Sequence, residues 1–142
     1  MKKGLIFLCF VFAFSVCAFS QNTRTFTIEI TNVVVNNGNI IIAVFGSAEE
    51  FRNETPTQAF SLPSTATAVR QEVTLPYGEY LITSFQDANG NNDMDFNFLG
   101  IPKEILGMTN WNGRGFPSRN FDRHKVPVNA STTVISIGLF KI

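Results

Sequence analysis

The sequence predicts an all-β fold, an antiparallel β-sandwich that is interrupted by one long, ordered loop excursion. Apolar and polar residues alternate through several short segments, which is the period-two pattern of half-buried strands. Gly, Pro and Asn, which favour turns, separate these segments. No segment after residue 20 keeps a helical period over ten or more residues. Short strands joined by such turns are typical of a β-sandwich.

Residues 1–20 are expected to be a signal peptide that lies outside this fold. Two lysines open the segment, an apolar run from Gly4 to Phe14 follows, and the small residues of Ala18-Phe19-Ser20 precede the expected cleavage point. The apolar run is too short for a membrane span, so we expect no stable span after cleavage. The domain that remains is residues 21–142.

Cys17 raises the alternative of a lipoprotein, in which the cysteine would become the lipidated first residue. The preceding Phe14-Ser15-Val16 differs from such signals, which have Leu in the first place and Gly or Ala in the last. We therefore expect a soluble exported protein, periplasmic or extracellular. Cleavage would remove both cysteines, so the domain has no disulfide.

The charge of the domain argues against a nucleic-acid partner. Without Lys2 and Lys3, 9 of the 11 basic residues remain against 11 acidic ones, a net charge of −2. No basic stripe is left to follow a phosphate backbone, so we expect no nucleic acid among the partners.

The first half of the domain carries strand and turn patterns in order. Phe and Ile alternate with polar residues over 25–30, which predicts a strand with one buried face. The Asn-Gly pair within Asn36–Asn39 predicts a tight hairpin turn, because both residue types tolerate positive φ. The apolar run Ile40–Phe45 predicts a central strand. Ser47–Asn53 predicts one helical turn with its serine as the cap, and the two prolines of 55–64 predict a loop or an irregular edge.

Three further strands complete the predicted sandwich. Alternation over 69–75 predicts one strand, and Leu75–Tyr80 predicts a turn because its proline fixes φ and its glycine relaxes it. Tyr80–Gln86 then predicts a strand that ends at Asp87. Alternation over 133–139 predicts the last strand.

The excursion runs from Asp87 to about Val126. A connection of nearly forty residues is uncommon in a compact domain, and such loops are usually functional or disordered. Its many large apolar residues argue against disorder, and we expect them to anchor the excursion on the sandwich. They are Phe96, Phe98, Leu99, Ile101, Ile105, Leu106, Met108, Trp111, Phe116 and Phe121.

Oxygen-bearing side chains fall on every second residue at the start of the excursion. Such spacing lets a short loop curl around one hard cation, so it predicts a calcium site. The residues are Asp87, Asn89, Asn91, Asp93 and Asp95. Counted from Asp87, the first, third and fifth places match the opening of an EF-hand loop. The seventh place would use a backbone carbonyl, and the ninth would use Asp95, directly or through water.

Two places depart from the EF-hand pattern. The sixth is Asn92 instead of Gly, although Asn also adopts a left-handed conformation. The twelfth is Phe98 instead of a bidentate Glu, so a further ligand must come from elsewhere, with Glu104 or Asp122 as the candidates. The alternative is a metal-free polar turn. Mutual repulsion of three Asp favours calcium over that turn, and magnesium is disfavoured because it retains its waters.

Several motifs occur together in a fixed order. They are Asp87-x-Asn89-x-Asn91-x-x-x-Asp95, Gly100-Ile101-Pro102-Lys103-Glu104, Gly107-Met108-Thr109-Asn110 and Gly115-Phe116-Pro117. This order resembles an exported bacterial family catalogued as domain of unknown function 2141, with Thr109 where we expect Ser. The segment Gly38–Phe45 and the turn Leu75–Tyr80 also fit it. The resemblance implies export and fold but no established activity. The turn is also similar to one in prealbumin-like and adhesin domains, which suggests a prealbumin-like or immunoglobulin-like architecture by analogy.

The main functional hypothesis is a binding or structural module at the cell envelope. Trp111, set among Asn and Gly, is the candidate for an exposed contact, and Arg114 could bind an anionic group. A carbohydrate or an envelope protein would be the partner. Phe96 and Phe98 are the other aromatic residues near the loop, and for these we favour a role as core anchors.

Catalysis is disfavoured. The one histidine, His124, lies in a charged run that predicts a solvated surface, and no Gly-x-Ser-x-Gly motif occurs. One histidine without cysteines cannot supply a typical catalytic zinc site. The alternative is a cell-envelope hydrolase that uses His124 and the acids of the 87–122 region.

Overall fold

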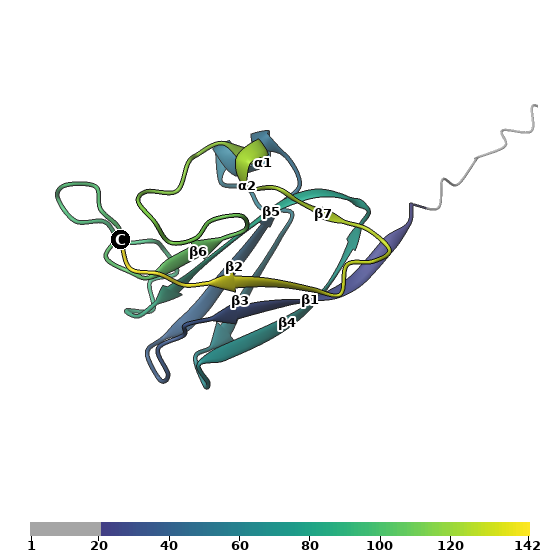
Figure 1. Ribbon diagram of the computed structural model, residues 1–142. Helices are drawn as coiled ribbons and strands as arrows, with labels where there is room; N and C mark the ends of the chain where they lie inside the picture. Colours follow the sequence, from purple (N-terminus) through teal and green to yellow (C-terminus); the bar gives the residue numbers. More distant parts are fainter. Residues whose placement is uncertain (1–20) are drawn as a thin grey trace, which may run out of the picture.

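Two stacked β-sheets make up the part of the chain that the computed structural model describes, residues 21–142 (Figure 1). The expected signal peptide, with Cys17, lies outside the described residues. The first sheet has three strands in the order β4 (Ala68–Pro76), β1 (Thr23–Thr31) and β8 (Val134–Gly138). Strand β1 pairs with β4 in antiparallel and with β8 in parallel orientation. The predicted all-β sandwich is confirmed, with one parallel pair among its antiparallel ones.

The second sheet carries the excursion at its end. Its strands follow the order β3 (Gln58–Pro63), β2 (Asn39–Phe45), β5 (Gly78–Asp87) and β6 (Leu106–Met108), all in antiparallel pairs. Strand β7 (Val126–Val128) pairs with the beginning of β5. Two short helices, α1 (Ala48–Asn53) and α2 (Phe121–His124), lie in the connections. In residues 21–142 no helix is long and apolar enough to cross a membrane.

The core lies between the sheets and contains the residues that the alternating patterns predicted. Side chains at alternate positions of a strand share a face, so every second apolar residue points inward. Burial of this much apolar surface is the main term that stabilises the fold. The core cluster consists of Phe26, Ile28, Ile30, Val33, Ile40, Ile42, Val44, Val69, Val73, Leu75, Tyr80, Ile82, Val128, Ile137 and Leu139.

The predicted hairpin at Asn36–Asn39 is wrong, although the turn exists. Asn36 and Gly38 have the positive φ that the residue types favour, 58° and 76°. The strands on either side do not pair, because β1 belongs to the first sheet and β2 to the second. The segment is therefore an arch between layers. Strands β1 and β2 each have an apolar face, and the face-to-face stacking of the two sheets buries both.

The segment 55–64, expected to be a loop or an irregular edge, lies at a sheet edge but forms a regular strand over Gln58–Pro63. Strand β3 can lie at the edge because only its last residue is a proline, where no ladder hydrogen bond is needed. The predicted helical turn before it is confirmed: Ser47 caps α1 by accepting a hydrogen bond from the Glu50 N–H at 3.1 Å. Hydrogen bonds from the Thr57 hydroxyl and the Gly46 N–H hold the pKa of Glu50 below its usual value.

A buried tyrosine fixes the second arch, between β4 and β5. The Tyr80 hydroxyl donates a hydrogen bond to the Pro76 carbonyl oxygen at 3.0 Å, four residues upstream. Burial, followed by the charge of Glu50, raises the pKa of Tyr80. The hydroxyl therefore stays a donor across the physiological pH range, and the predicted turn is held by a side chain from the strand that follows it.

Replacing Tyr80 by Phe is expected to lower the free energy of unfolding by about 1 kcal/mol, the usual value of one such hydrogen bond. The ring and its packing remain, so urea denaturation should show a lower midpoint with an unchanged slope. Tyr77→Phe is the control because Tyr77 is exposed and has no recorded side-chain hydrogen bond within residues 21–142. Equal effects of the two substitutions would contradict a structural role for the Tyr80 hydroxyl.

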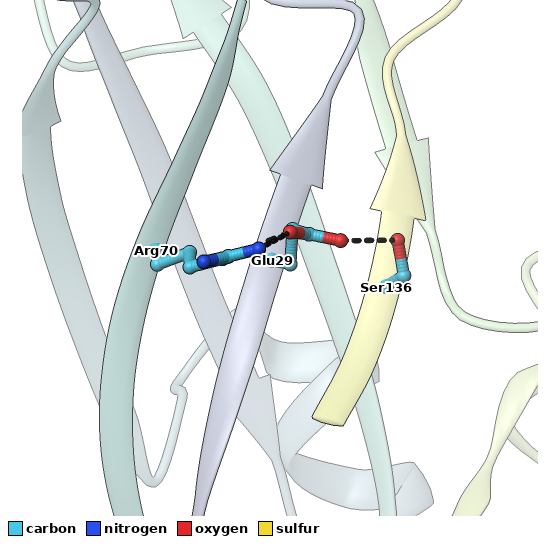
Figure 2. Close-up of polar contacts among 3 residues, drawn as sticks. All are labelled: Glu29, Arg70 and Ser136. Atoms are coloured by element: carbon cyan, nitrogen blue, oxygen red, sulfur yellow. Dashed lines mark hydrogen bonds and ion pairs between the residues drawn. The ribbon is translucent and has the colours of Figure 1, made fainter. Parts of the chain in front are cut away.

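The outer face of the first sheet is polar and is linked across its three strands (Figure 2). Glu29 on the central strand β1 accepts hydrogen bonds from Arg70 of β4, at 2.7 and 2.9 Å, and from the Ser136 hydroxyl of β8 at 3.4 Å. Because Arg70 is largely exposed, this ion pair adds little to stability. The contacts indicate that this face is solvated.

Candidate functional site

The five oxygen-bearing residues predicted to bind a cation lie in the first turn of the excursion, residues 87–95, which we call the cation loop. Strand β5 ends at Asp87, which pairs with Asn39 of β2 and is 0% exposed. Asn89, Asn91 and Asp93 are exposed and Asp95 is half-buried. The loop thus has one buried acidic residue at its base and polar groups around its rim.

The Asp87 carboxylate organises the backbone of this loop. Its Oδ1 accepts hydrogen bonds from the N–H groups of Gly90 and Asn91, at 2.8 and 3.2 Å. Its Oδ2 accepts one from the Asn92 N–H at 2.9 Å. Hydrogen bonds to an ionised carboxylate are stronger than those between neutral groups. Three successive N–H groups on one carboxylate therefore hold the chain in a tight curl.

Two Asx-turns continue the curl. The Oδ1 atom of Asn89 accepts a hydrogen bond from the Asn91 N–H at 3.1 Å, and that of Asn91 accepts one from the Asp93 N–H at 2.9 Å. Asn92 has a φ of 61°, the left-handed conformation that the missing sixth-place glycine would supply. Asn92 therefore adopts the left-handed backbone conformation that was expected of it.

Glu104 joins the two ends of the cation loop by hydrogen bonds. It is 8% exposed, and its Oε1 accepts a hydrogen bond from the Ala88 N–H at 3.1 Å. Its Oε2 accepts one from the Asp95 N–H at 3.4 Å. Of the two acids proposed as an extra ligand, Glu104 thus reaches both ends of the loop. The other, Asp122, lies in α2 and forms an ion pair with Lys125 at 3.0 Å.

The rim of the loop is held by amide to carboxylate contacts. The Asn89 Nδ2 donates to Asp95 Oδ2 at 2.5 Å, and the Asn91 Nδ2 lies 3.3 Å from both Asp95 oxygens. The side-chain nitrogens of the two Asn therefore face Asp95, while their oxygens accept backbone hydrogen bonds. Each amide oxygen keeps a second lone pair that could ligate a cation.

Carboxylates alone would not form a metal site here. Within residues 21–142, no group of three or more His, Cys, Asp or Glu side chains converges as a metal cluster. A cation in the loop would need amide and backbone carbonyl oxygens besides Asp95. Those are ligands that calcium accepts readily, and they match the donor set of the EF-hand pattern.

The expected roles of the aromatic residues are reversed. Phe98 is 95% exposed and Phe96 is 55% exposed, so neither is a core anchor. Trp111, expected to be the exposed contact, is only half-exposed and packs edge-on against Phe140 with ring centroids 5.8 Å apart. Arg114 is exposed as expected. Trp111 is partly buried because Phe140, which follows β8, packs against its ring. This contact joins segments that are far apart in the sequence.

Other members of the excursion do anchor it. Leu106 and Met108 are 7% and 8% exposed and add β6 to the sheet beside β5. Leu99 and Phe116, at 67% and 63% exposed, do not. The expectation of apolar anchors is thus correct for β6 and wrong for Phe116 and for the segment around residues 96–99.

His124 is buried, at 5% exposed, and this corrects the expected solvated run. Its Nδ1 lies 3.1 Å from the Thr109 carbonyl oxygen, so Nδ1 carries the proton and donates. Its Nε2 has no hydrogen-bond partner within residues 21–142. In α2 the His124 side chain faces inward, while its neighbour Arg123 is exposed. The hydrogen-bond partner of the His124 Nδ1 is a backbone carbonyl, whereas a hydrolase triad needs an acid at this position.

A hollow of about 560 Å³ lies on the outer face of the second sheet, beside the cation loop. Its floor is apolar and comes from the outward residues of β2, β5 and β6, among them Ile41 and Phe85. Residues 92–94 and Phe96 form one wall, and Arg119, paired with Glu54 at 3.2 Å, lies at another. The geometry of the cation loop therefore shapes one side of a concave surface.

Two residues that support the site were missed in the sequence. Gln86 is 1% exposed, and its amide exchanges hydrogen bonds with the N–H and carbonyl of Val34 at 3.0 and 2.7 Å and with the Asn37 carbonyl at 2.8 Å. Gly38 lies directly against the Asp87 backbone. The sequence did contain a signal for Gln86. It lies four places after Ile82 and therefore on the same inward face of the strand, where a polar side chain needs hydrogen-bond partners.

Comparison with known proteins gives one match. The model of a family described as an uncharacterized protein conserved in bacteria matches residues 28–136, which include the whole cation loop, Glu104 and the hollow. No curated protein and no solved structure matches the chain. The match confirms the resemblance that the order of the motifs indicated.

Proposed function

The chain belongs to the bacterial family DUF2141, and we propose its function from the geometry of the cation loop. The resemblance to this family implies no established activity. The protein is an exported β-sandwich module whose cation loop binds calcium. Its role is binding or structural support in the periplasm or outside the cell. The calcium orders the loop, and the loop in turn holds one wall of the hollow on the second sheet.

The observation that carries this proposal is the Asp87 carboxylate with its three successive backbone N–H groups. In an EF-hand loop the first acidic residue stands at the start of the same curl, and the sixth residue makes the sharp turn. Here Asp87 has that place, Asn92 makes the left-handed turn, and Glu104 joins the two ends of the loop through the Ala88 and Asp95 N–H groups. These contacts support the proposal of a calcium loop although the sequence departs from the EF-hand pattern at two places.

The remaining ligands are polar groups at the rim. Asp95 would supply a carboxylate and Asn89 and Asn91 their amide oxygens, with a backbone carbonyl at Asp93. Calcium would replace the amide to carboxylate hydrogen bonds that now hold Asp95. A flexible set of several oxygens suits calcium better than magnesium, which demands near-octahedral geometry.

The binding role is supported by the hollow. An apolar floor with a few polar groups at its walls is the usual character of a ligand site. The candidate partners are a carbohydrate or an envelope protein, and the candidate contacts are Phe96 and Arg119 at the walls of the hollow, with Arg114 as the further exposed cation. Trp111 contributes as a packed support for its loop.

The test is thermal unfolding of residues 21–142, which contain both sheets and the whole core, in EDTA and in about 10 mM calcium. That concentration is about 100 times a dissociation constant of roughly 0.1 mM, the tighter end of the range of extracellular calcium modules. Calcium at 100 times its dissociation constant should add about 2.7 kcal/mol. For a domain of this size that raises Tm by about 10 °C. Asp95→Asn should abolish the increase, because it removes the one carboxylate that faces both asparagine amides.

Glu72→Gln is the matched control, since it removes the same charge from an exposed position on β4. The wild-type increase should persist in this variant. No increase with calcium would show that the run of Asp and Asn is a metal-free turn, and an equal increase with magnesium would contradict the preference for calcium. Asp87 is not the residue for this test, because its loss would disturb the loop with or without a metal.

A further inference from the structure

The segment directly after the cation loop projects large apolar side chains into solvent. Residues 96–102, Phe-Asn-Phe-Leu-Gly-Ile-Pro, carry no charge, and we call them the apolar tip. Phe98 is 95% exposed, Leu99 67% and Phe96 55%. The long connection after β5 extends beyond the ends of the sheets (Figure 1). Adjacent exposed apolar residues of this size usually mark an interaction surface.

The backbone of the apolar tip is held in one conformation by hydrogen bonds. Phe96 and Pro102 form an antiparallel bridge at its base. The Asn97 N–H donates to the Ile101 carbonyl at 2.9 Å, and the Gly100 N–H donates to the Asn97 carbonyl at 2.9 Å. Gly100 has a φ of 75°, which allows the tight turn. Phe98 and Leu99 are therefore held at the apex by hydrogen bonds rather than by packing.

One side chain satisfies two further backbone donors of the tip. The Asn97 Oδ1 accepts hydrogen bonds from the N–H groups of Leu99 and Ile101, at 2.9 and 3.0 Å. Four of the five N–H groups in residues 97–101 thus have partners inside the tip. A backbone donor that enters an apolar medium without a partner costs several kcal/mol. The tip avoids most of that cost. A loop that stays in water does not need such internal pairing, because water can accept the hydrogen bonds of its N–H groups.

We propose that the apolar tip inserts Phe98 and Leu99 into the surface of an anionic phospholipid membrane and anchors the domain there peripherally. Satisfied backbone donors and exposed apolar side chains at a convex apex fit the boundary between head groups and acyl chains. The ammonium group of Lys141 donates to the Lys103 carbonyl at the base of the tip, and both lysines are exposed. They would lie at the depth of the anionic head groups.

A protein partner fits this feature less well. A stable protein interface buries about 800 Å² on each side and uses some 20–30 residues. The apolar tip offers three large side chains on one turn, which is too little for such an interface. Insertion into a membrane needs only a few apolar side chains together with nearby positive charge.

The inference goes beyond the proposed function and does not require calcium. The cation loop and the tip are nonetheless joined, because the Lys103 N–H donates to the Asp95 carbonyl at 2.8 Å. Each can be tested separately, since the calcium test measures stability without lipid and the membrane test can be made in EDTA.

The experiment is co-sedimentation of residues 21–142 with vesicles of equal parts phosphatidylcholine and phosphatidylglycerol, and with vesicles of phosphatidylcholine alone. The wild type should bind the anionic vesicles. The double variant Phe98→Ser, Leu99→Ser should lose about tenfold or more of its partition coefficient. Phe116→Ser is the control, because Phe116 is 63% exposed on another loop, and it should bind like the wild type. Circular dichroism of each variant should match the wild type, since no side chain in the tip belongs to the core.

A second measurement places the contact. In Phe98→Trp, quenching by lipids brominated on the acyl chains should exceed that of the wild type, whose one tryptophan, Trp111, is half-buried. Binding that is unchanged in the double serine variant would overturn the proposal, as would no sedimentation of the wild type. Self-association that depends on Phe98 without lipid would also overturn it, in favour of a second copy of the chain. Tip-dependent binding in EDTA, with no thermal effect of calcium, would support the tip and contradict the calcium site.

Discussion

Replacing Asp87 by Ala is expected to lower the free energy of unfolding by about 3 kcal/mol in EDTA. The carboxylate is 0% exposed and accepts hydrogen bonds from three N–H groups. A charge-assisted hydrogen bond contributes about 1.5–3 kcal/mol, although water can reach the exposed residues 90–92 and replace part of this. Urea denaturation in EDTA measures the effect without any contribution from a metal.

Asp93→Ala is the matched control for this prediction. Asp93 is an exposed acid in the same loop, and its carboxylate has no recorded hydrogen bond within residues 21–142. Its loss should change the free energy of unfolding by no more than about 0.5 kcal/mol. Asp87→Asn should fall between the two, since one oxygen remains but an amide donor faces an N–H group. Equal effects of Asp87→Ala and Asp93→Ala would mean that the carboxylate does not organise the loop.

Gly38→Ala is expected to be more damaging and to cost about 4 kcal/mol or to prevent folding. A Cβ atom at Gly38 would lie 1.9 Å from the carbonyl oxygen of Asp87 and 2.8 Å from its carbonyl carbon. Both atoms are backbone, so the arch before β2 would have to move away from the end of β5. A left-handed φ of 76° adds about 1 kcal/mol for any residue with a Cβ. Urea denaturation of the variant measures the total.

Gly90→Ala separates the steric clash with the Asp87 backbone from the cost of a positive φ. Gly90 has nearly the same φ, 77°, but a Cβ there would meet no atom within 4 Å. Its cost should therefore be only the conformational term, about 1 kcal/mol. A similar cost for both alanines would show that the Gly38 contact relaxes easily and does not hold the cation loop on the sheet.

The predicted parts of the fold share a local cause. The strands at Phe26–Ile30, Ile40–Phe45 and Val69–Leu75 follow from alternation, which depends only on neighbours along the chain. The α1 cap at Ser47 and the left-handed turn at Asn92 are local for the same reason. These features were predicted because each depends on a few consecutive residues.

The wrong predictions concern partners distant in the sequence. The turn before β2 has the expected backbone, but whether it joins paired strands depends on which sheet each strand enters. Trp111 is covered by Phe140, and His124 is turned inward toward the Thr109 carbonyl. Burial of such side chains is decided by segments that come together only on folding.

The candidate site shows the same division. The sequence by itself determined the β-sandwich, the spacing of the oxygen-bearing residues and the family, because strand period and motif order are local properties of the chain. Only the tertiary structure decided that Glu104 rather than Asp122 closes the cation loop, and that Phe98 is exposed. The physical reason is that side-chain burial and carboxylate partners depend on distances across the fold, which the packing of β5, β6 and the arches determines.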